Sequence, residues 1–237
     1  MVHEAQADAV ESSNIVGYQE VTLDENFSLF TVTFKGVGAE NGYDVQDIIP
    51  LDVNGEVVSA NNRVIIQKLN SDGGYVSTTY NYRQTRGGWC QGSTYLGREA
   101  LLLKEGEAVC VNNQTGGKIN LRVSGEVVLQ PVSMTFGENF SLAGNMTPAT
   151  IDIQDIIPYD SGTDTEITAN NRVIIQKMTS DGGYESTTYN YRKSRGGWCQ
   201  GSTVLSRGTV TFTPGQAFCL NNQTGASIVL KFKSPIE

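Results

Sequence analysis

The chain has 237 residues, 38% of them hydrophobic and only 18% charged, with 26 glycines and a formal net charge of -8. This acidic balance provides no basic field for nucleic acid or an anionic membrane surface. The single histidine, His3, lies in a polar tail, so Ser-His-Asp and Cys-His catalysis and multi-histidine metal sites are close to excluded. No run of 18 apolar residues occurs that would predict a membrane-spanning helix.

The N-terminal tail, residues 1–13, is polar and acidic and has no counterpart later in the chain. It lacks the apolar h-region of a signal peptide, although Ala5-Gln6-Ala7 has the small-x-small form of a cleavage site. That tripeptide is explained equally well by chance and by cleavage after export. We therefore leave both readings open.

A strand-like segment follows the tail, and Gly17 weakens it as an isolated element. Residues 18–23 are expected to pair within their own domain. Residues 8–17 are expected to be ordered by a neighbouring chain, whose open sheet edge they would complete by strand addition. The candidate donor residues are Ile15, Val16 and Gly17.

An internal repeat dominates the rest of the sequence. Residues 61–94 recur as residues 170–203 with 29 of 34 positions identical, and the match extends outward through ENFSL, QDIIP and NNQTG. A unit of about 110 residues is a normal size for one small domain. The repeat predicts two tandem domains, residues 14–126 and residues 127–237.

Each copy has the pattern of a β-protein. The β-branched run 63–68 and the alternating run 75–83 flank the turn sequence 70–74, which predicts a hairpin. A second hairpin is expected around residues 104–107 and 213–216, and closing strands at 119–123 and 228–232. Segments 45–49 and 153–157 allow one helical turn before a proline. The expected fold is all-β, an antiparallel sandwich or barrel in each domain.

The four cysteines follow the repeat, with 20 residues between the two in each copy. Pairing within each copy predicts the disulfides Cys90–Cys110 and Cys199–Cys219, and two buried free thiols per domain are the alternative. Two cysteines without histidine cannot supply an ordinary zinc site, so we expect no metal and no cofactor.

The nearly unchanged block 61–94 carries the functional prediction. Core packing alone preserves one face of a strand, but both faces of 75–83 recur in the second copy. Either a tightly coupled structural motif or contact with something outside the domain explains this. The external contact would be a glycan-binding or an assembly surface. Its candidate residues are Tyr80, Tyr82, Arg83, Arg86 and Trp89, with Tyr189, Tyr191, Arg192, Arg195 and Trp198.

The opening SNIVGYQEVTL, the GGY-xxxx-Y-x-Y hairpin and the GGWCQGS turn resemble a set of secreted bacterial tandem β-repeat proteins. The resemblance covers most of the chain and implies export, but it implies no enzymatic activity. The second copy departs from it, with VVLQPVSMT in place of the NIVGY strand.

The sequence therefore predicts an extracellular or cell-surface structural protein that associates with copies of itself as a filament, appendage or surface-layer subunit. The alternative is a two-domain carbohydrate-binding module that uses the Tyr/Arg/Trp block of each repeat. An enzyme is not expected, because no nucleophile-base pair appears.

Overall fold

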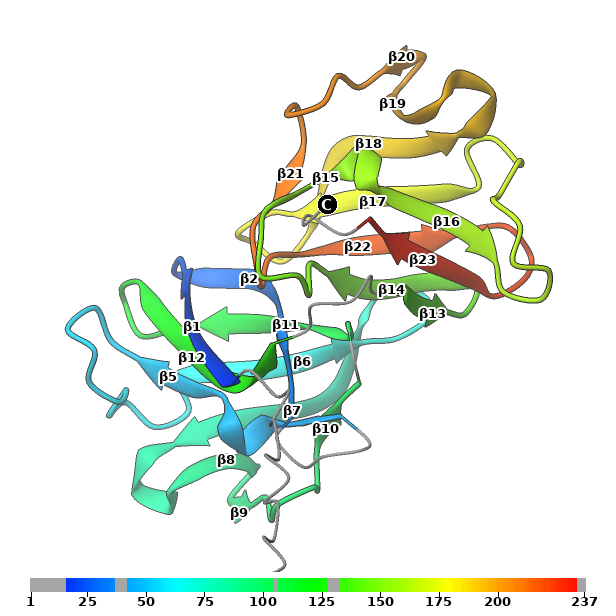
Figure 1. Cartoon of the computed structure of the whole chain (residues 1–237). Coiled ribbons are helices and arrows are strands. Elements are labelled where there is room, and N and C mark those ends of the chain that lie inside the picture. Colours follow the sequence, from blue (N-terminus) through cyan, green and yellow to red (C-terminus); the bar gives the residue numbers. More distant parts are fainter. Residues whose placement is uncertain (1–15, 37–41, 105, 128–132, 234–237) are drawn as a thin grey trace, which may run out of the picture.

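A computed structural model describes residues 16–36, 42–104, 106–127 and 133–233. In these residues the chain forms antiparallel strands and four single turns of 3-10 helix, which confirms the all-β prediction. Figure 1 shows two bodies side by side, one coloured blue to green and the other green to red. They correspond to the first and second repeats. No helix in this part of the chain is long and apolar enough to cross a membrane.

Each repeat contains one six-stranded sheet, and the two sheets have the same strand order. In the first repeat the order is β2 (Asn26–Thr31), β11 (Ala108–Asn113), β6 (Val64–Leu69), β7 (Tyr75–Arg83), β8 (Gly88–Gln91) and β9 (Thr94–Tyr95). In the second repeat it is β14 (Asn139–Gly144), β22 (Ala217–Asn222), β17 (Val173–Met178), β18 (Tyr184–Arg192), β19 (Gly197–Gln200) and β20 (Thr203–Val204).

A smaller sheet faces each large one. In the first repeat β12 (Ile119–Val127) pairs with β1 (Val16–Leu23) on one side and with β3 (Phe34–Lys35) and β5 (Ile49–Leu51) on the other. In the second repeat β23 (Ile228–Phe232) lies between β13 (Ser133–Phe136) and β16 (Ile156–Asp160). Two short pairs complete the described strands, β4 (Tyr43–Asp44) with β10 (Leu102–Leu103) and β15 (Ile151–Asp152) with β21 (Thr211–Phe212).

The core of each repeat lies between its sheets. Along β12 the side chains of Ile119, Leu121 and Val123 are buried while the intervening Arg122 and Ser124 are exposed, the period of two that a sheet with one buried face requires. The buried apolar residues form one cluster in each repeat. Both repeats thus have the packed antiparallel sheets expected of the all-β class.

The predicted turns are present, but the second turn of each repeat connects two different sheets instead of closing a hairpin. The hairpin of β6 and β7 is confirmed, with the amide of Asn70 donating to the carbonyl of Gly74 at 2.8 Å. The turns at 104–107 and 213–216 also form. They do not make a second hairpin, because β10 pairs with β4 while β11 pairs with β2 and β6. Each of these turns carries the chain from one sheet to another.

The single helical turns before proline are confirmed as η1 (Val45–Asp47) and η3 (Ile153–Asp155). Two further turns, η2 (Gln84–Arg86) and η4 (Lys193–Arg195), precede β8 and β19. Asp44 begins η1 by accepting a hydrogen bond from the amide of Gln46 at 2.9 Å. This hydrogen bond holds the backbone of Gln46 in place and so positions its side chain.

The Gln46 amide then joins the helical turn to the strand that carries Trp89. Its Nε2 donates to the carbonyls of Trp89 and Leu96 at 2.9 and 2.8 Å, and its Oε1 accepts from the Trp89 amide at 3.0 Å. A Cβ on Gly88 would lie 2.3 Å from that Oε1, so only glycine fits there. Gln154 makes the same three bonds around Trp198 in the second repeat.

We predict that Gln46→Ala lowers the free energy of unfolding by about 2–4 kcal/mol, because the Trp89 amide and the Leu96 carbonyl lose their side-chain partner, while the Trp89 carbonyl keeps only the Leu96 amide. Urea unfolding followed by tryptophan fluorescence measures the change. Gln91→Ala, on the exposed face of β8, is the control and should stay within about 0.5 kcal/mol of the parent. Equal effects of the two changes would contradict a role for the Gln46 amide.

Candidate functional site

The two tryptophans of the predicted surface are not on the surface. Trp89 and Trp198 are fully buried, and their indole N–H groups donate to the carbonyls of Ile48 and Ile156 at 2.8 and 2.7 Å. A buried ring cannot stack on a sugar or meet another subunit. The part of the prediction that rests on the tryptophans is therefore wrong, and both rings belong to the core.

The tyrosines of the block divide between core and half-buried positions. Tyr82 and Tyr191 are buried and meet the tryptophans edge to face, with ring centroids 5.5 and 5.3 Å apart. Tyr189 is also buried, and Tyr80 is half-buried against the core. These rings are packing residues first.

The arginines lie at the rim of the same motif. Arg83 Nε donates to Asn62 Oδ1 at 2.6 Å, and Arg192 bonds Asn171 in the same way. Arg86 and Arg195 are exposed. The recurrence of NNR together with YNYR thus has an internal cause, because the asparagine of one segment holds the arginine of the other.

Contact between the two repeats is a second cause of the sequence recurrence. The Tyr75 hydroxyl donates to the carbonyl of Gly182 at 2.9 Å, and the Tyr184 hydroxyl donates to the carbonyl of Gly73 at 3.0 Å. These four residues are pairwise equivalent in the two copies. Each repeat therefore contacts the other with the same residues, as in an isologous interface with two-fold symmetry.

The rest of the interface obeys the same symmetry. The amides of Phe27 and Phe140 each donate at 3.2 Å to a serine carbonyl of the opposite repeat, Ser180 and Ser71. Within each repeat the phenylalanine ring stacks on the tyrosine, with centroids 6.2 and 6.3 Å apart. This surface explains why ENFSL and SDGGY recur: each copy must fit its own counterpart.

The centre of the interface is a sulfur-containing cluster. Leu29, Ala108 and Cys110 of the first repeat pack with Leu142, Ala217 and Cys219 of the second. Cys110 Sγ lies 3.9 Å from Met178 Sδ. Burial raises the pKa of both the Cys110 and the Cys219 thiol to about 11, so neither is a ready nucleophile at neutral pH.

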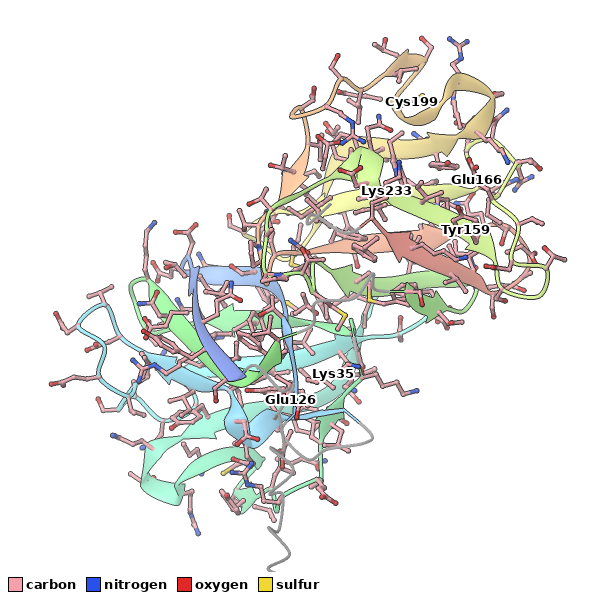
Figure 2. All side chains as sticks on the ribbon, in the orientation of Figure 1. Lys35, Glu126, Tyr159, Glu166, Cys199 and Lys233 are labelled. Atoms are coloured by element: carbon pink, nitrogen blue, oxygen red, sulfur yellow. The ribbon has the colours of Figure 1, made fainter. Side chains whose placement is uncertain are left out.

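The predicted disulfides are absent. All four cysteines are free and buried, and the sheet order explains why they do not pair as expected. Cys90 on β8 and Cys110 on β11 are separated by β7 and β6, so three strand spacings of about 4.8 Å part them. A disulfide requires Cα atoms within about 7 Å. Cys199 and Cys219 are separated in the same way, and Figure 2 places Cys199 at the far end of the second repeat.

Two grooves flank the interface, one on each side of the pseudo-two-fold axis. The β1 groove, of about 430 Å³, lies between residues 21–29 of the first repeat and β17 with the turn 213–217 of the second. The β13 groove, of about 480 Å³, lies between residues 133–142 of the second repeat and the residues Lys68, Leu69, Lys104, Glu107 and Ala108 of the first. Nearly every lining residue of one groove has its counterpart in the other.

Each groove is bounded by a strand at the edge of a sheet. Among the described residues β12 is the sole strand partner of β1, and β23 is the sole strand partner of β13. The outer edge of each strand can therefore accept a further strand through backbone hydrogen bonds. The site offers main-chain donors and acceptors beside a shallow, mostly polar wall.

The candidate donor strand is placed differently from the prediction. Residues 18–23 pair within their own repeat, as expected. Val16 and Gly17 also pair there, opposite Glu126 and Gly125, so their assignment to a neighbouring chain is wrong. Their register continues that of the following residues without a break. Ile15 lies outside the described residues, as does the rest of the predicted donor segment.

The acidic side chains of the helical turn η1 are engaged in hydrogen bonds and an ion pair. Asp44 accepts from the amides of Gln46 and Glu99, and Asp47 pairs with Arg98. Across the described ranges no group of three or more His, Cys, Asp or Glu side chains could hold a metal ion.

Comparison with known proteins identifies no relative: no family model matches the sequence, and no curated protein or solved structure matches it.

Sequence reasoning missed the residues of the interface, although they left a signal. Gly73 and Tyr75 stand in the identical block, and Phe27 stands in the recurring ENFSL, yet none of them was assigned a role. The signal was recurrence on the strand face that points away from the Trp89 core. At Tyr75 that face meets the other repeat.

We predict that native protein resists a thiol-alkylating reagent at pH 8, whereas protein unfolded without reductant shows four alkylated cysteines by intact mass. The reason is that all four thiols are reduced and buried, two of them with a pKa of about 11. Fewer than four labels after unfolding would reveal a disulfide and contradict the arrangement described here.

We also predict that Gly73→Ala or Gly182→Ala opens the interface without unfolding the repeats. At both positions φ is positive, and a Cβ would lie 3.1 Å from a phenylalanine ring of the opposite repeat. Overpacking of this kind should raise the alkylation rate of Cys110 and Cys219 roughly ten-fold relative to the rate at Cys90 and Cys199. Peptide mass mapping over time measures the rate at each cysteine.

Matched controls for that experiment are Gly87→Ala and Gly196→Ala. These glycines also have positive φ, but a Cβ would meet nothing within 4 Å. They carry the same backbone strain without the contact. Unchanged relative labelling is expected in the controls, and the same acceleration in all four variants would contradict an interface effect.

Proposed function

We propose that this chain is a structural subunit of an extracellular or cell-surface assembly, and that it associates with copies of itself by adding a strand to a free sheet edge. The observation that carries the proposal is the pair of grooves beside β1 and β13. Each combines an edge strand of one repeat with a wall supplied by the other.

The self-complementary interface supports an assembly role in a second way. It buries the inward surfaces of both repeats against each other and gives them a fixed relative orientation. Two edge strands are then presented at defined positions on one body. A subunit that must repeat at a constant angle benefits from such rigidity, because a flexible linker between domains would let the angle vary.

The carbohydrate-binding alternative loses its main support with the burial of the tryptophans. Flat aromatic rings at the surface are the feature that such a module needs, and Trp89 and Trp198 are both inside. The proposal of an extracellular setting rests on the resemblance of the NIVGY and GGW motifs to secreted β-repeat proteins. It no longer draws on disulfides.

We predict that blocking a groove weakens self-association. Thr135 on β13 and Thr22 on β1 are equivalent, exposed residues that line the two grooves. An arginine at either position projects a long charged side chain into the groove, where it should hinder an added strand. Light scattering coupled to gel filtration, with electron microscopy of the concentrated protein, measures the state of association.

The expected result is a shift of at least one of the variants Thr135→Arg and Thr22→Arg toward monomer, with urea unfolding unchanged. Gln91→Ala, on the exposed face of β8 and outside the linings of both grooves, serves as the control and should associate like the parent. Parent protein that remains monomeric at every concentration tested would refute the proposed function.

A further inference from the structure

The two grooves are alike in shape but differ in charge. The β13 groove contains Lys68, Lys104 and Glu107, a formal charge of +1. The β1 groove contains Lys177, Asp24 and Glu185, a formal charge of -1. On a chain with a net charge of -8, the β13 groove is thus a local positive site beside a free strand edge. Lys118 pairs with Asp24 at 2.9 Å and offsets part of the negative charge of the β1 groove, so the charge difference favours the β13 groove for an acidic ligand.

The one carboxylate of the β13 groove is already occupied. Glu107 Oε1 pairs with Lys68 Nζ at 2.7 Å, and Glu107 Oε2 accepts a hydrogen bond from the amide of Lys104 at 2.9 Å. The Lys104 side chain is exposed. An acidic strand entering this groove therefore meets the Lys104 ammonium and a carboxylate whose charge is balanced by its neighbours.

The chain itself contains a segment with matching chemistry. Residues 1–15 include Glu4, Asp8 and Glu11 and no lysine, arginine or proline. In an extended conformation the three alanines at 5, 7 and 9 share one face, and Gln6 and Asp8 share the other. Small side chains on one face suit a shallow groove, and the missing proline leaves every backbone N–H free to donate.

The first residue of β1 lies away from the groove that the last residues of the strand line. Residues 21–24, at the end of β1, line the groove against the second repeat, so Val16 lies five residues back along the strand, about 17 Å from that wall. Figure 1 shows β1 running toward the second repeat, with its first residue at the distant end. The sequence before Val16 therefore joins β1 at the end farther from this groove.

We propose that residues 5–11 of a second copy add as a strand to the free edge of β13, with Asp8 near Lys104. The inference rests on the proposed function and deepens it by assigning donor and acceptor. Donor and acceptor surfaces differ, so the contact is head-to-tail, and each chain has one of each. Repetition then generates an open chain of subunits rather than a closed dimer.

Cysteine cross-linking between two chains tests this assignment. One variant carries a cysteine at Gln6, Ala7 or Asp8, in turn, so that both strand faces are sampled. The other carries Thr135→Cys. The native cysteines are all buried and do not interfere. The mixture is then mildly oxidised. For at least one of the three N-terminal positions, we expect a disulfide that joins the introduced cysteine to the cysteine at position 135 of the other chain.

The matched control replaces Thr135→Cys by Thr22→Cys, the equivalent residue of the β1 groove, and we expect at least fivefold less cross-linked product. Equal yields at the two grooves would overturn the choice of groove. A double variant that cross-links only within one chain would overturn the assignment to a second copy.

A charge exchange gives an independent readout. Lys104→Glu should raise the concentration for half-maximal association by about threefold, the size expected for one exposed ion pair. Combining it with Asp8→Lys should restore the parent value. Thr213→Glu, at the equivalent position beside the β1 groove, should leave association unchanged. Failure of the combined variant to recover would contradict the contact between Asp8 and Lys104.

These experiments separate the inference from the proposed function. A parent that associates normally but never cross-links through Thr135→Cys refutes the inference alone. A parent that does not associate refutes the proposed function itself.

Discussion

The hydrogen bond from a tyrosine hydroxyl to a glycine carbonyl of the other repeat, made twice, is the contact on which the arrangement of this molecule depends. Burial raises the pKa of both hydroxyls, first of all by desolvation, so they remain protonated donors. A self-complementary surface imposes one constraint on two sequences at once. A substitution at Gly73 or Tyr75 must remain compatible with the surface of the second repeat as well as with the packing of the first. This explains why the turn segments stayed identical while nearby strands diverged.

Local patterns predicted local structure well. The alternation along 75–83 and the glycine-rich turn before it correctly predicted the hairpin, and the prolines correctly predicted where η1 and η3 end. These features depend only on residues that are neighbours in the sequence. The second hairpin and the disulfides failed for the opposite reason. Both depend on which strands become neighbours, and a turn sequence does not say whether its flanking strands share a sheet.

The site prediction failed at the tryptophans. On 75–83 one face packs in the core around Trp89, which the Gln46 amide holds, and Tyr75 at the start of the strand contacts the opposite repeat. The second constraint that the structure shows therefore lies at the turn end of the strand, since Ser77 is exposed and Arg83 bonds Asn62 of its own repeat. Sequence could not assign the second constraint to a contact inside the chain, since an external partner leaves the same pattern. Only the placement of Phe27 against residues 180–182 distinguishes the two.

The pairing of β1 with β12 has a mechanical consequence. Eight consecutive residues, Val16–Leu23, stand opposite 119–126 in one unbroken antiparallel register. A load applied through the residues before Val16 acts along the strand axis, parallel to β1 and perpendicular to its interstrand hydrogen bonds. The strand must then slide, and the bonds share the force rather than rupturing one after another from an end. A molecule joined to its neighbour through this segment would resist stretching at the joint by shear of a whole strand.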